Sequence, residues 1–496
     1  MRSVLSSRFL PAVVVAAVLA VVYGLVAAGH PAGAAAGQAA GRGRSVPVTA
    51  VQRGCPGLGM AGGTSGRIAM VAASGSGNGR AVATSLAASG GGTPLLTASQ
   101  PAHLALGFVS PGGRAPVIPA RSGGQPVATV RLAGGVVVNA SGAMAQGLDV
   151  EQTDGASVPT ATCTSPGTDF WFTGPGQRGA GRIQLYLMNP ADQAADVSVE
   201  IATDAGPVQG SADAGIAVPP HSMVMQSLAP ALPGSRAVLL HVRTSVGQVV
   251  AGVRDSTGGG GGWLPPAQAP ASRLIVPGLP ATPGTRTLFL AVPGQRDAHV
   301  TIAAVTSRGS YQPTGGGGID VPGGSAIEVS LPSMAGIPAA LKLTASVPVT
   351  ASVMLPGGAA GSPGVFTAAS APLREQGVVA ANLAGGSGSS ALILSAPRQP
   401  ATVRITELGG NGGRDKTVQV AAGRTKVVQL AAPAGVRHGA PFPVQVTPQP
   451  GSGPVYAGRV VQAAGNGAVA ALTPVGSALT AVPLPAVRAE PITSQP

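Results

Sequence analysis

The chain has 496 residues and a formal net charge of +13, yet only 9% of its residues are charged. Its 76 glycines and 47 prolines exclude a protein built from long amphipathic helices, and its 44% hydrophobic content excludes an intrinsically disordered chain. The positive residues are scattered singly along the sequence, so no basic run for nucleic-acid binding is present. The composition predicts an all-β protein of several domains without a nucleic-acid partner.

The sequence begins with an export segment. Residues 1–8 contain Arg2 and Arg8 but no acidic residue, and residues 10–28 are predominantly apolar. An apolar run of about 17–25 residues can span a bilayer, which favours an uncleaved signal anchor. The small residues Ala32 to Ala34 leave cleavage of a signal peptide directly after them as an alternative, and the protein is then secreted. In both cases the positive flank predicts that everything downstream lies outside the cytoplasm.

The two cysteines, Cys55 and Cys163, both follow the export segment. Disulfides persist in the oxidising compartments outside the cytoplasm, so we predict that these two residues pair. On the chain-entropy model, a bridge that closes a loop of about 100 residues stabilises a fold by up to about 4–5 kcal/mol, less any strain. The cysteines have neither the C-x-x-C spacing of a redox motif nor the nearby histidines of a zinc site.

A pattern of short strands recurs downstream at intervals of roughly 100 residues. Each copy contains a closing strand with the sequence Val-x-Ala-[Gly/Ser]. Three copies are clear, and the region from Val46 is interpreted as a divergent first copy. Six or seven short strands in about 100 residues are typical of an immunoglobulin-like or fibronectin-like sandwich, whereas propeller repeats are about 40–50 residues long. The alanines of the four motifs are Ala140, Ala251, Ala351 and Ala457.

The clearest copy covers residues 182–254. Within it, residues 196–203 alternate between apolar and polar side chains, which predicts a strand with one buried and one solvated face. Residues 215–228 are predicted to form a two-stranded hairpin around a pair of adjacent prolines.

We therefore predict tandem immunoglobulin-like or fibronectin-like β-sandwich modules after an N-terminal transmembrane or signal helix. The joints between modules are rich in Gly and Pro, a composition that disfavours both helix and strand. The predicted boundaries are 1–30 for the signal anchor or signal peptide, 31–45 for a flexible linker, 46–165 for module 1, 166–257 for module 2, 258–284 for a linker, 285–356 for module 3, 357–389 for a linker, 390–488 for module 4 and 489–496 for a tail.

Three of the few aromatic residues follow the second cysteine as Phe170, Trp171 and Phe172. Alternation along a strand predicts that Phe170 and Phe172 share one face while Trp171 lies on the other. Packing against the disulfide and the sandwich core is the leading interpretation, and a platform on which a sugar ring stacks is the alternative. Trp263, which follows five glycines, is predicted to hold a linker against a neighbouring module.

The sequence contains no recognisable catalytic motif. A G-x-G-x-x-G match at residues 57–62 lacks the βαβ context of a dinucleotide site and is ascribed to the high glycine content. The densest acidic group is Asp149, Glu151 and Asp154. Its carboxylates suit catalysis or metal binding, but a solvated loop is the preferred interpretation. We therefore predict that the protein is not an enzyme and has no catalytic residue, no metal site and no cofactor.

Several of these features together resemble an actinobacterial family of exported or membrane-anchored proteins of unknown function. They are the N-terminal anchor, the block Cys55–Pro56–Gly57, the block from Cys163 to Phe172, and the β-rich repeats. The resemblance covers the chain from Val46 to the C-terminus. It implies a location in the cell envelope and transfers no active site.

The leading functional prediction is a non-enzymatic cell-envelope protein. Its anchor contacts the membrane through residues 10–28, and its extracytoplasmic β-sandwich array scaffolds or binds cell-wall polymers or other envelope proteins. The alternative, from a different class, is a carbohydrate-binding or carbohydrate-active protein that uses Phe170, Trp171 and Phe172.

Overall fold

A computed structural model describes the part of the chain that contains the predicted modules. The residues described are 45–56, 66–73, 77–86, 94–98, 105–109, 135–154, 161–177, 181–211, 215–257, 260–331, 336–357, 364–409, 413–465 and 467–483. The predicted anchor at 10–28, the glycine motif at 57–62 and the predicted tail at 489–496 lie outside these residues. In the part described, no helix is both long enough and apolar enough to cross a membrane.

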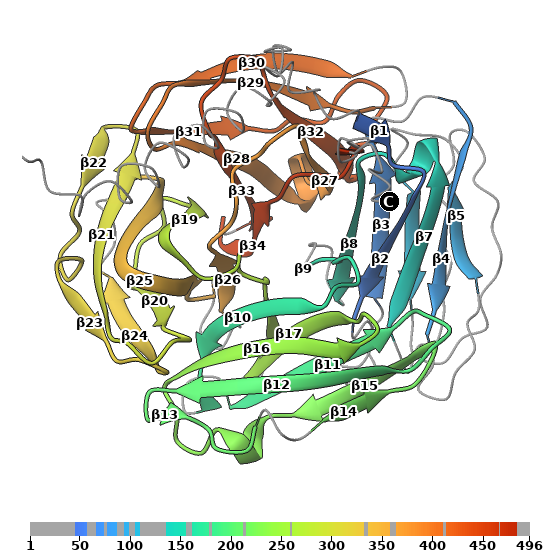
Figure 1. Cartoon of the computed structure of the whole chain (residues 1–496). Coiled ribbons are helices and arrows are strands. Elements are labelled where there is room, and N and C mark those ends of the chain that lie inside the picture. The colour runs from blue at the N-terminus through green and yellow to red at the C-terminus, as the bar shows by residue number, and fades with distance from the viewer. Residues whose placement is uncertain are drawn as a thin grey trace, which may run out of the picture. The chain divides into compact units, whose positions relative to one another are not determined.

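The predicted all-β class is confirmed. Throughout the described ranges, the regular elements are strands, apart from the short 3-10 helices η1 (Ala143–Ala145), η2 (Ala229–Ala231) and η3 (Gly385–Ser387). The chain divides into a small unit, Met1–Val46 with Val482–Pro496, and a large unit, Pro47–Ala481. Strands β1 (Ser45–Pro47) and β35 (Ala481–Pro483) pair with each other in a two-stranded sheet. The strands of the large unit form four successive sets, which we call the first to fourth sheet sets (Figure 1).

The first sheet set consists of two four-stranded sheets, β2-β7-β4-β5 and β6-β3-β8-β9, which share a hydrophobic core. Strand β3 is buried on both faces. Ile68 and Met70 belong to that core, whereas Ala69 and Val71 pack into a second cluster on the opposite face. The strands are β2 (Ala50–Cys55), β3 (Gly66–Ala72), β4 (Gly79–Ser85), β5 (Pro94–Ala98), β6 (Ala105–Val109), β7 (Val136–Gly142), β8 (Leu148–Asp154) and β9 (Ala161–Thr162).

The second sheet set has the sheets β10-β16-β12-β13, with β14 also paired to β12, and β15-β11-β17-β18. Val197, Val199 and Ile201 of β12 lie in the shared core, which confirms the predicted alternation. The strands are β10 (Asp169–Pro175), β11 (Arg182–Asn189), β12 (Ala195–Thr203), β13 (Gly206–Pro207), β14 (Ile216–Val218), β15 (Ser222–Ser227), β16 (Ala237–Val246), β17 (Val250–Thr257) and β18 (Gly260–Leu264).

The third sheet set is organised around one long strand, β25 (Ala339–Leu355). The first part of β25 pairs with β21 and its last part pairs with β20, so this strand belongs to two groups of paired strands. The other strands are β19 (Ala271–Leu279), β20 (Arg286–Ala291), β21 (Ala298–Thr306), β22 (Gly309–Tyr311), β23 (Ile319–Val321), β24 (Ala326–Leu331) and β26 (Val365–Ala368).

The fourth sheet set has the sheets β27-β32-β29-β30 and β31-β28-β33-β34 around a core that includes Phe442. Strand β29 shows the expected alternation, because Val403 and Ile405 are fully buried between more exposed neighbours. The strands are β27 (Gly377–Asn382), β28 (Gly388–Ala396), β29 (Ala401–Glu407), β30 (Arg414–Val420), β31 (Arg424–Gln429), β32 (Phe442–Pro448), β33 (Tyr456–Ala463) and β34 (Val469–Val475).

The hairpin predicted at residues 215–228 is wrong. Strand β14 pairs with β12, whereas β15 pairs with β11 in the other sheet, so the chain changes sheets between them. Pro219 and Pro220 explain the change, because proline has no N–H to continue a sheet ladder. The next residue, His221, has a φ of 48°, which turns the backbone further.

The linkers predicted at 258–284 and 357–389 are also wrong in part, because strands β18, β19, β26 and β27 form there. Strand β18 pairs with β17 despite its glycines. A side chain at Gly262 would collide with the Gly364 carbonyl and the Phe366 ring. Glycine thus allows β18 to lie close to the segment that contains Gly364 and Phe366. The hydrogen bonds between β18 and β17 offset the low strand propensity of the glycines.

Small apolar clusters join the sheet sets. Trp263 and Tyr186 of the second set pack in one cluster with Val137 of the first, so Trp263 contacts a neighbouring set as predicted. Phe289 of the third set packs with residues of the second set, and Gly458 of the fourth packs against Gly278 of the third. The fourth set also contacts the first, where β27 packs against β3 and β8.

Candidate functional site

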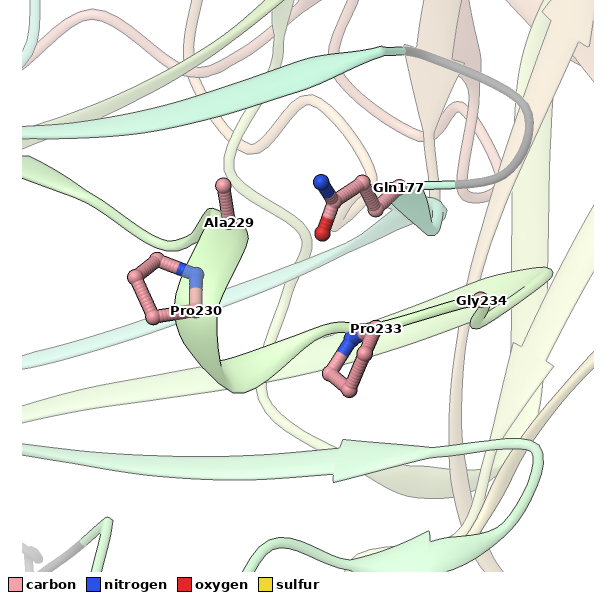
Figure 2. Close-up of a pocket in the computed structure, with 5 residues that line it drawn as sticks. All are labelled: Gln177, Ala229, Pro230, Pro233 and Gly234. Atoms are coloured by element: carbon pink, nitrogen blue, oxygen red, sulfur yellow. The ribbon is translucent and has the colours of Figure 1, made fainter.

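One pocket of about 560 Å³ lies beside η2, and Figure 2 shows its lining. It is formed by Gln177, Ala229, Pro230, Pro233 and Gly234. None of these five residues has an ionisable or aromatic side chain, so this pocket offers little to hold or transform a ligand. Its size alone does not make it a functional site.

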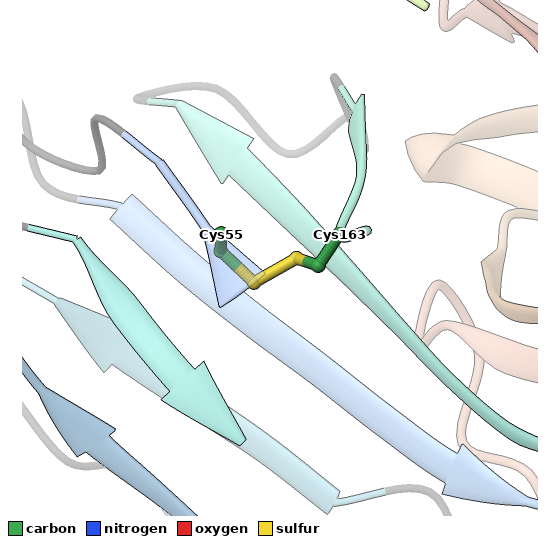
Figure 3. Close-up of a disulfide and its surroundings, with 2 residues drawn as sticks. All are labelled: Cys55 and Cys163. Atoms are coloured by element: carbon green, nitrogen blue, oxygen red, sulfur yellow. A yellow bond between two sulfur atoms is a disulfide. The ribbon is translucent and has the colours of Figure 1, made fainter. Parts of the chain in front are cut away.

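The predicted disulfide is confirmed and lies at the edge of a more informative region (Figure 3). Cys55 ends β2 and Cys163 follows β9, so the bridge joins the two sheets of the first sheet set. Their Cα atoms are 4.6 Å apart, within the usual range for a bridge. Next to it, the Gly54 N–H donates to the Thr164 carbonyl at 2.7 Å, which fixes the start of the segment that leads to β10.

Two members of the acidic group, Asp149 and Glu151, lie on strand β8, next to the disulfide. Leu148 and Val150 face the core of the first sheet set, so Asp149 and Glu151 point to the opposite face. There Asp149 is 8% exposed and Glu151 is 1% exposed. Strand alternation places both carboxylates where β8 packs against β27. The prediction that this acidic group lies in a solvated loop is therefore wrong for Asp149 and Glu151. The third acid, Asp154, is the last residue of β8.

Strand β27 supplies backbone donors to both carboxylates. The Ala380 N–H donates to Asp149 Oδ2 at 2.8 Å, and the Ala381 N–H donates to Glu151 Oε2 at 3.0 Å. Consecutive amides of one strand thus bind alternate side chains of another. These bonds satisfy backbone groups of β27 that would otherwise be buried without a partner.

Arg459 of β33 completes the arrangement. Its Nη1 donates to Glu151 Oε2 at 2.8 Å and to the Ala381 carbonyl at 2.8 Å, while Nη2 donates to Thr473 Oγ1 at 2.9 Å. The Arg459 side chain is 0% exposed. Two polar atoms have no hydrogen-bond partner, the Nε of Arg459 and the Oε1 of Glu151. The ion pair is therefore fully buried but incompletely hydrogen-bonded.

Burial dominates the electrostatics of the site. Removal from water, with a further contribution from the Glu151 charge, raises the pKa of Asp149 to about 7. Burial also raises the pKa of Glu151, although Arg459 opposes this. Arg53 of β2 lies nearby, bonded to Ser165 Oγ, and burial lowers its pKa while the Asp149 charge raises it. The two carboxyls are thus opposed by two guanidinium groups.

A pocket of about 420 Å³ opens beside these groups. Asp149, Glu151 and Arg53 line it together with residues of the Thr164–Gly167 segment, and Phe170 forms part of its apolar wall. The pocket brings the acidic group and one of the predicted aromatic residues to the same place. Its carboxyl groups can accept hydrogen bonds from a ligand, and Asp149, with a pKa of about 7, can exchange a proton near neutral pH.

The three aromatic residues do not form a common stacking platform. Phe172 is 0% exposed in the core of the second sheet set, which also contacts Phe170. Trp171 lies on the opposite face, where its ring stacks on His241 with centroids 3.5 Å apart. The predicted alternation is correct, but Phe172 is fully buried and His241 occupies one face of Trp171. Among the three, Phe170 lines the pocket beside β8.

No arrangement typical of a metal centre is found among the residues that the structure describes. A search of them for three or more His, Cys, Asp or Glu side chains placed to hold an ion finds no such group. Near Trp171, His241 lies 3.3 Å from Asp169 and 3.2 Å from Glu200, so its ring joins two carboxylates of neighbouring strands.

The sequence reasoning missed Arg53 and Arg459. A signal for Arg459 was present, because it interrupts the apolar run from Ala457 to Val461 in a strand that forms part of a repeat. A charged residue at such a position must find a buried partner. The sequence could not identify that partner, since Glu151 lies 308 positions away.

Comparison with known proteins adds a family but no activity. No curated protein matches the sequence significantly. A family model matches residues 117–431, a range that includes Asp149, Glu151 and Phe170 but neither Arg53 nor Arg459. Because this match spans more than half of the chain, the protein belongs to DUF5719, a family of unknown function.

Proposed function

We propose that this chain is a non-enzymatic protein of the cell envelope that scaffolds or binds other envelope components. Its extracytoplasmic part is an array of immunoglobulin-like or fibronectin-like β-sandwich modules, and residues 10–28 anchor it to the membrane. Cell-wall polymers and other envelope proteins are the proposed partners.

The observation that carries this proposal is a buried ion pair between two sheet sets. Glu151 and Arg459 join strands of the first and fourth sheet sets, which are separated by 308 positions in the sequence. Buried ionic contacts of this kind favour one arrangement of the joined elements, a property useful to a scaffold. The disulfide between Cys55 and Cys163 supports a location outside the cytoplasm, where such bonds persist.

Crosslinking in the native membrane tests the scaffold. The full chain, tagged at its C-terminus, is crosslinked in cells, purified under denaturing conditions and analysed by mass spectrometry. We expect envelope proteins or wall fragments to be enriched over a tagged membrane protein of similar abundance. Hydrolysis of purified cell-wall glycan by the wild-type protein, abolished in Glu151→Gln, would instead establish an enzyme and contradict the proposal.

The proposed anchor has its own test. Because about 17–25 apolar residues suffice to span a bilayer, the full-length chain should stay in the membrane fraction after a high-salt wash. Detection of a mature N-terminus near Ala35 by mass spectrometry would show that the segment is cleaved.

A second candidate function is carbohydrate binding. It is favoured by the position of Phe170, which lines the pocket beside β8 together with Asp149 and Glu151. Aromatic and carboxylate groups are suited to the apolar faces and hydroxyl groups of sugars, respectively. Saturable retention on purified peptidoglycan or other cell-wall glycans, lost in Phe170→Ala and kept in Trp171→Ala, is the expected result. Absence of saturable retention on every glycan would reject this candidate.

A further inference from the structure

We infer that the pocket beside β8 binds a neutral, hydroxyl-rich ring such as a single sugar residue. This inference rests on the second candidate function and specifies its site. The pocket is defined by Asp149, Glu151, Arg53, Thr164 and Phe170. Its volume of about 420 Å³ falls in the range of small-molecule sites, roughly 300–1,000 Å³.

The first argument comes from incomplete hydrogen bonding. Glu151 is only 1% exposed, yet its Oε1 has no hydrogen-bond partner in the protein. The Oγ1 of Thr164, which lines the same pocket, is also buried without a partner. A buried polar group without a partner costs about 1–3 kcal/mol, so such groups normally bind water or a ligand. A ligand hydroxyl can donate to Glu151 Oε1, and Thr164 can both donate and accept.

The second argument comes from charge. Arg459 already pairs with Glu151 at 2.8 Å, and the Arg53 charge acts on Asp149. Above a pH of about 7, where Asp149 is ionised, two acidic groups therefore face two basic groups without a ligand. A bound ammonium or phosphate would add a charge with no free counter-charge among these groups, and a charge buried in this way is unfavourable. A neutral ligand avoids that penalty while still using the free oxygens.

The third argument comes from the apolar wall. Phe170 is half-buried and packs against the core of the second sheet set, so its ring is held in place. Pro166 and Pro266 line the pocket with it. A rigid wall of this kind suits the face of a pyranose ring, which carries C–H groups, while its hydroxyls point toward the polar side. The pocket therefore offers both kinds of contact that a sugar requires.

Ligand-observed NMR of the purified full-length protein in detergent tests the inference directly. The probes are glucose, galactose, arabinose, N-acetylglucosamine and myo-inositol, with ethylammonium and inorganic phosphate as charged competitors. We expect saturable binding of at least one neutral probe. Thr164→Val replaces the hydroxyl with a methyl group and should weaken this binding about fivefold to tenfold, which corresponds to the contribution of one hydrogen bond. Phe170→Ala should weaken it further.

A matched control separates the pocket from general effects on the protein. Tyr311 is an exposed aromatic residue of the third sheet set, and Tyr311→Ala should bind the probe as the wild type does. Thr164→Val should also keep the wild-type melting temperature, because its hydroxyl has no partner in the protein. Equal weakening in the control, or a charged probe as the only ligand, would overturn the inference.

Two further outcomes distinguish the pocket from the function on which it rests. Neutral probes that bind with unchanged affinity in both Thr164→Val and Phe170→Ala would overturn the pocket but leave carbohydrate binding intact. If no neutral probe binds and no cell-wall glycan retains the protein, both the pocket and the second candidate function are rejected.

Discussion

Two buried glutamates of this protein show opposite electrostatic behaviour. Glu151 has a pKa raised by burial, despite its bond to Arg459. Burial also acts to raise the pKa of Glu407, the last residue of β29, but hydrogen bonds from Arg414, Ala431 and Lys416 together lower it below its usual value. Both carboxylates are at most 1% exposed, but Glu407 lies nearer to solvent than Glu151, so a smaller loss of hydration contributes to the difference.

The partners of the two glutamates also differ. Glu407 accepts bonds from Arg414 at 2.6 Å and from Lys416 at 3.1 Å, and these cations are 48% and 33% exposed. They keep much of their hydration while they neutralise the carboxylate. Arg459 is 0% exposed, so its pair with Glu151 has lost hydration on both sides. A local pair whose cations stay partly hydrated can thus stabilise its acid, whereas we expect a pair between distant strands chiefly to specify which strands meet.

The largest expected effect comes from breaking the buried pair. Arg459→Ala leaves the Glu151 charge buried without its cation, which should lower the free energy of unfolding by about 3–5 kcal/mol. The matched variant Arg414→Ala leaves Glu407 with Lys416 and the Ala431 amide, and should lower it by roughly 1 kcal/mol or less. Chemical denaturation monitored by circular dichroism measures both. Equal losses in the two variants would contradict the distinction between the two regions.

The disulfide gives the next largest effect. Cys55→Ser opens a loop with a sequence separation of 108, and removal of a native bridge typically costs about 2–5 kcal/mol. Because the bridge joins the two sheets of the first sheet set, its loss should chiefly affect that set. Hydrogen exchange followed by mass spectrometry should show that the variant exchanges faster than the wild type in β2 and β7, with little change in β28 and β29. Two free thiols in protein recovered from its native compartment would refute the pairing.

The pH dependence of stability sharpens the comparison further. The pKa of Asp149 is about 7 in the folded protein against an ordinary value of 3.8. Between these values the folded state binds more protons than the unfolded state, so stability should fall as the pH rises from about 4 to about 7. Glu151, Arg53 and Arg459 face this group and set the size of the effect.

Asp149→Asn mimics the protonated acid and can still accept the bond from the Ala380 N–H. It should therefore flatten the fall in stability across this pH window by about 1–4 kcal/mol, at about 1.4 kcal/mol for each pKa unit. Urea unfolding at pH 4.5 and pH 7.5 provides the measurement. An unchanged pH dependence in the variant would show that Asp149 is ionised at its ordinary pKa.

A smaller effect is expected where two backbones touch. A side chain at Gly458 of β33 would overlap with the Gly278 backbone, so Gly458→Ala should destabilise the protein by about 1–3 kcal/mol. Gly476→Ala is the control, because no atom lies within 4 Å of its added Cβ and its φ is not positive. Thermal melting of the two variants should differ, and identical curves would show that β19 and β33 do not meet in this way.

Part of this fold could be predicted from local patterns. Alternation placed Val197 and Ile201 on a buried face, and the presence of two cysteines after an export segment was enough to predict their bridge. Alternation also assigned Phe170 and Trp171 to opposite faces. In each case the prediction depends only on neighbouring residues or on the number of cysteines.

Other features could not be predicted because they depend on distant backbones. The glycines of β18 resemble a linker until Gly364 and Phe366 are seen beside Gly262. The two prolines after β14 indicate a turn but not a change of sheet. Similarly, the sequence reveals that Asp149 and Glu151 are close together, but not that amides of β27 and an arginine of β33 will bury them.

A double-mutant cycle between Glu151 and Arg459 tests the central structural claim most directly. The free energy of unfolding is measured for the wild type, Glu151→Gln, Arg459→Met and the double variant. Because the two side chains are 2.8 Å apart across 308 positions of sequence, we predict a coupling energy of about 1–3 kcal/mol, with the double variant more stable than the sum of the single losses implies. Additivity to within about 0.5 kcal/mol would mean that the first and fourth sheet sets are not joined by this pair.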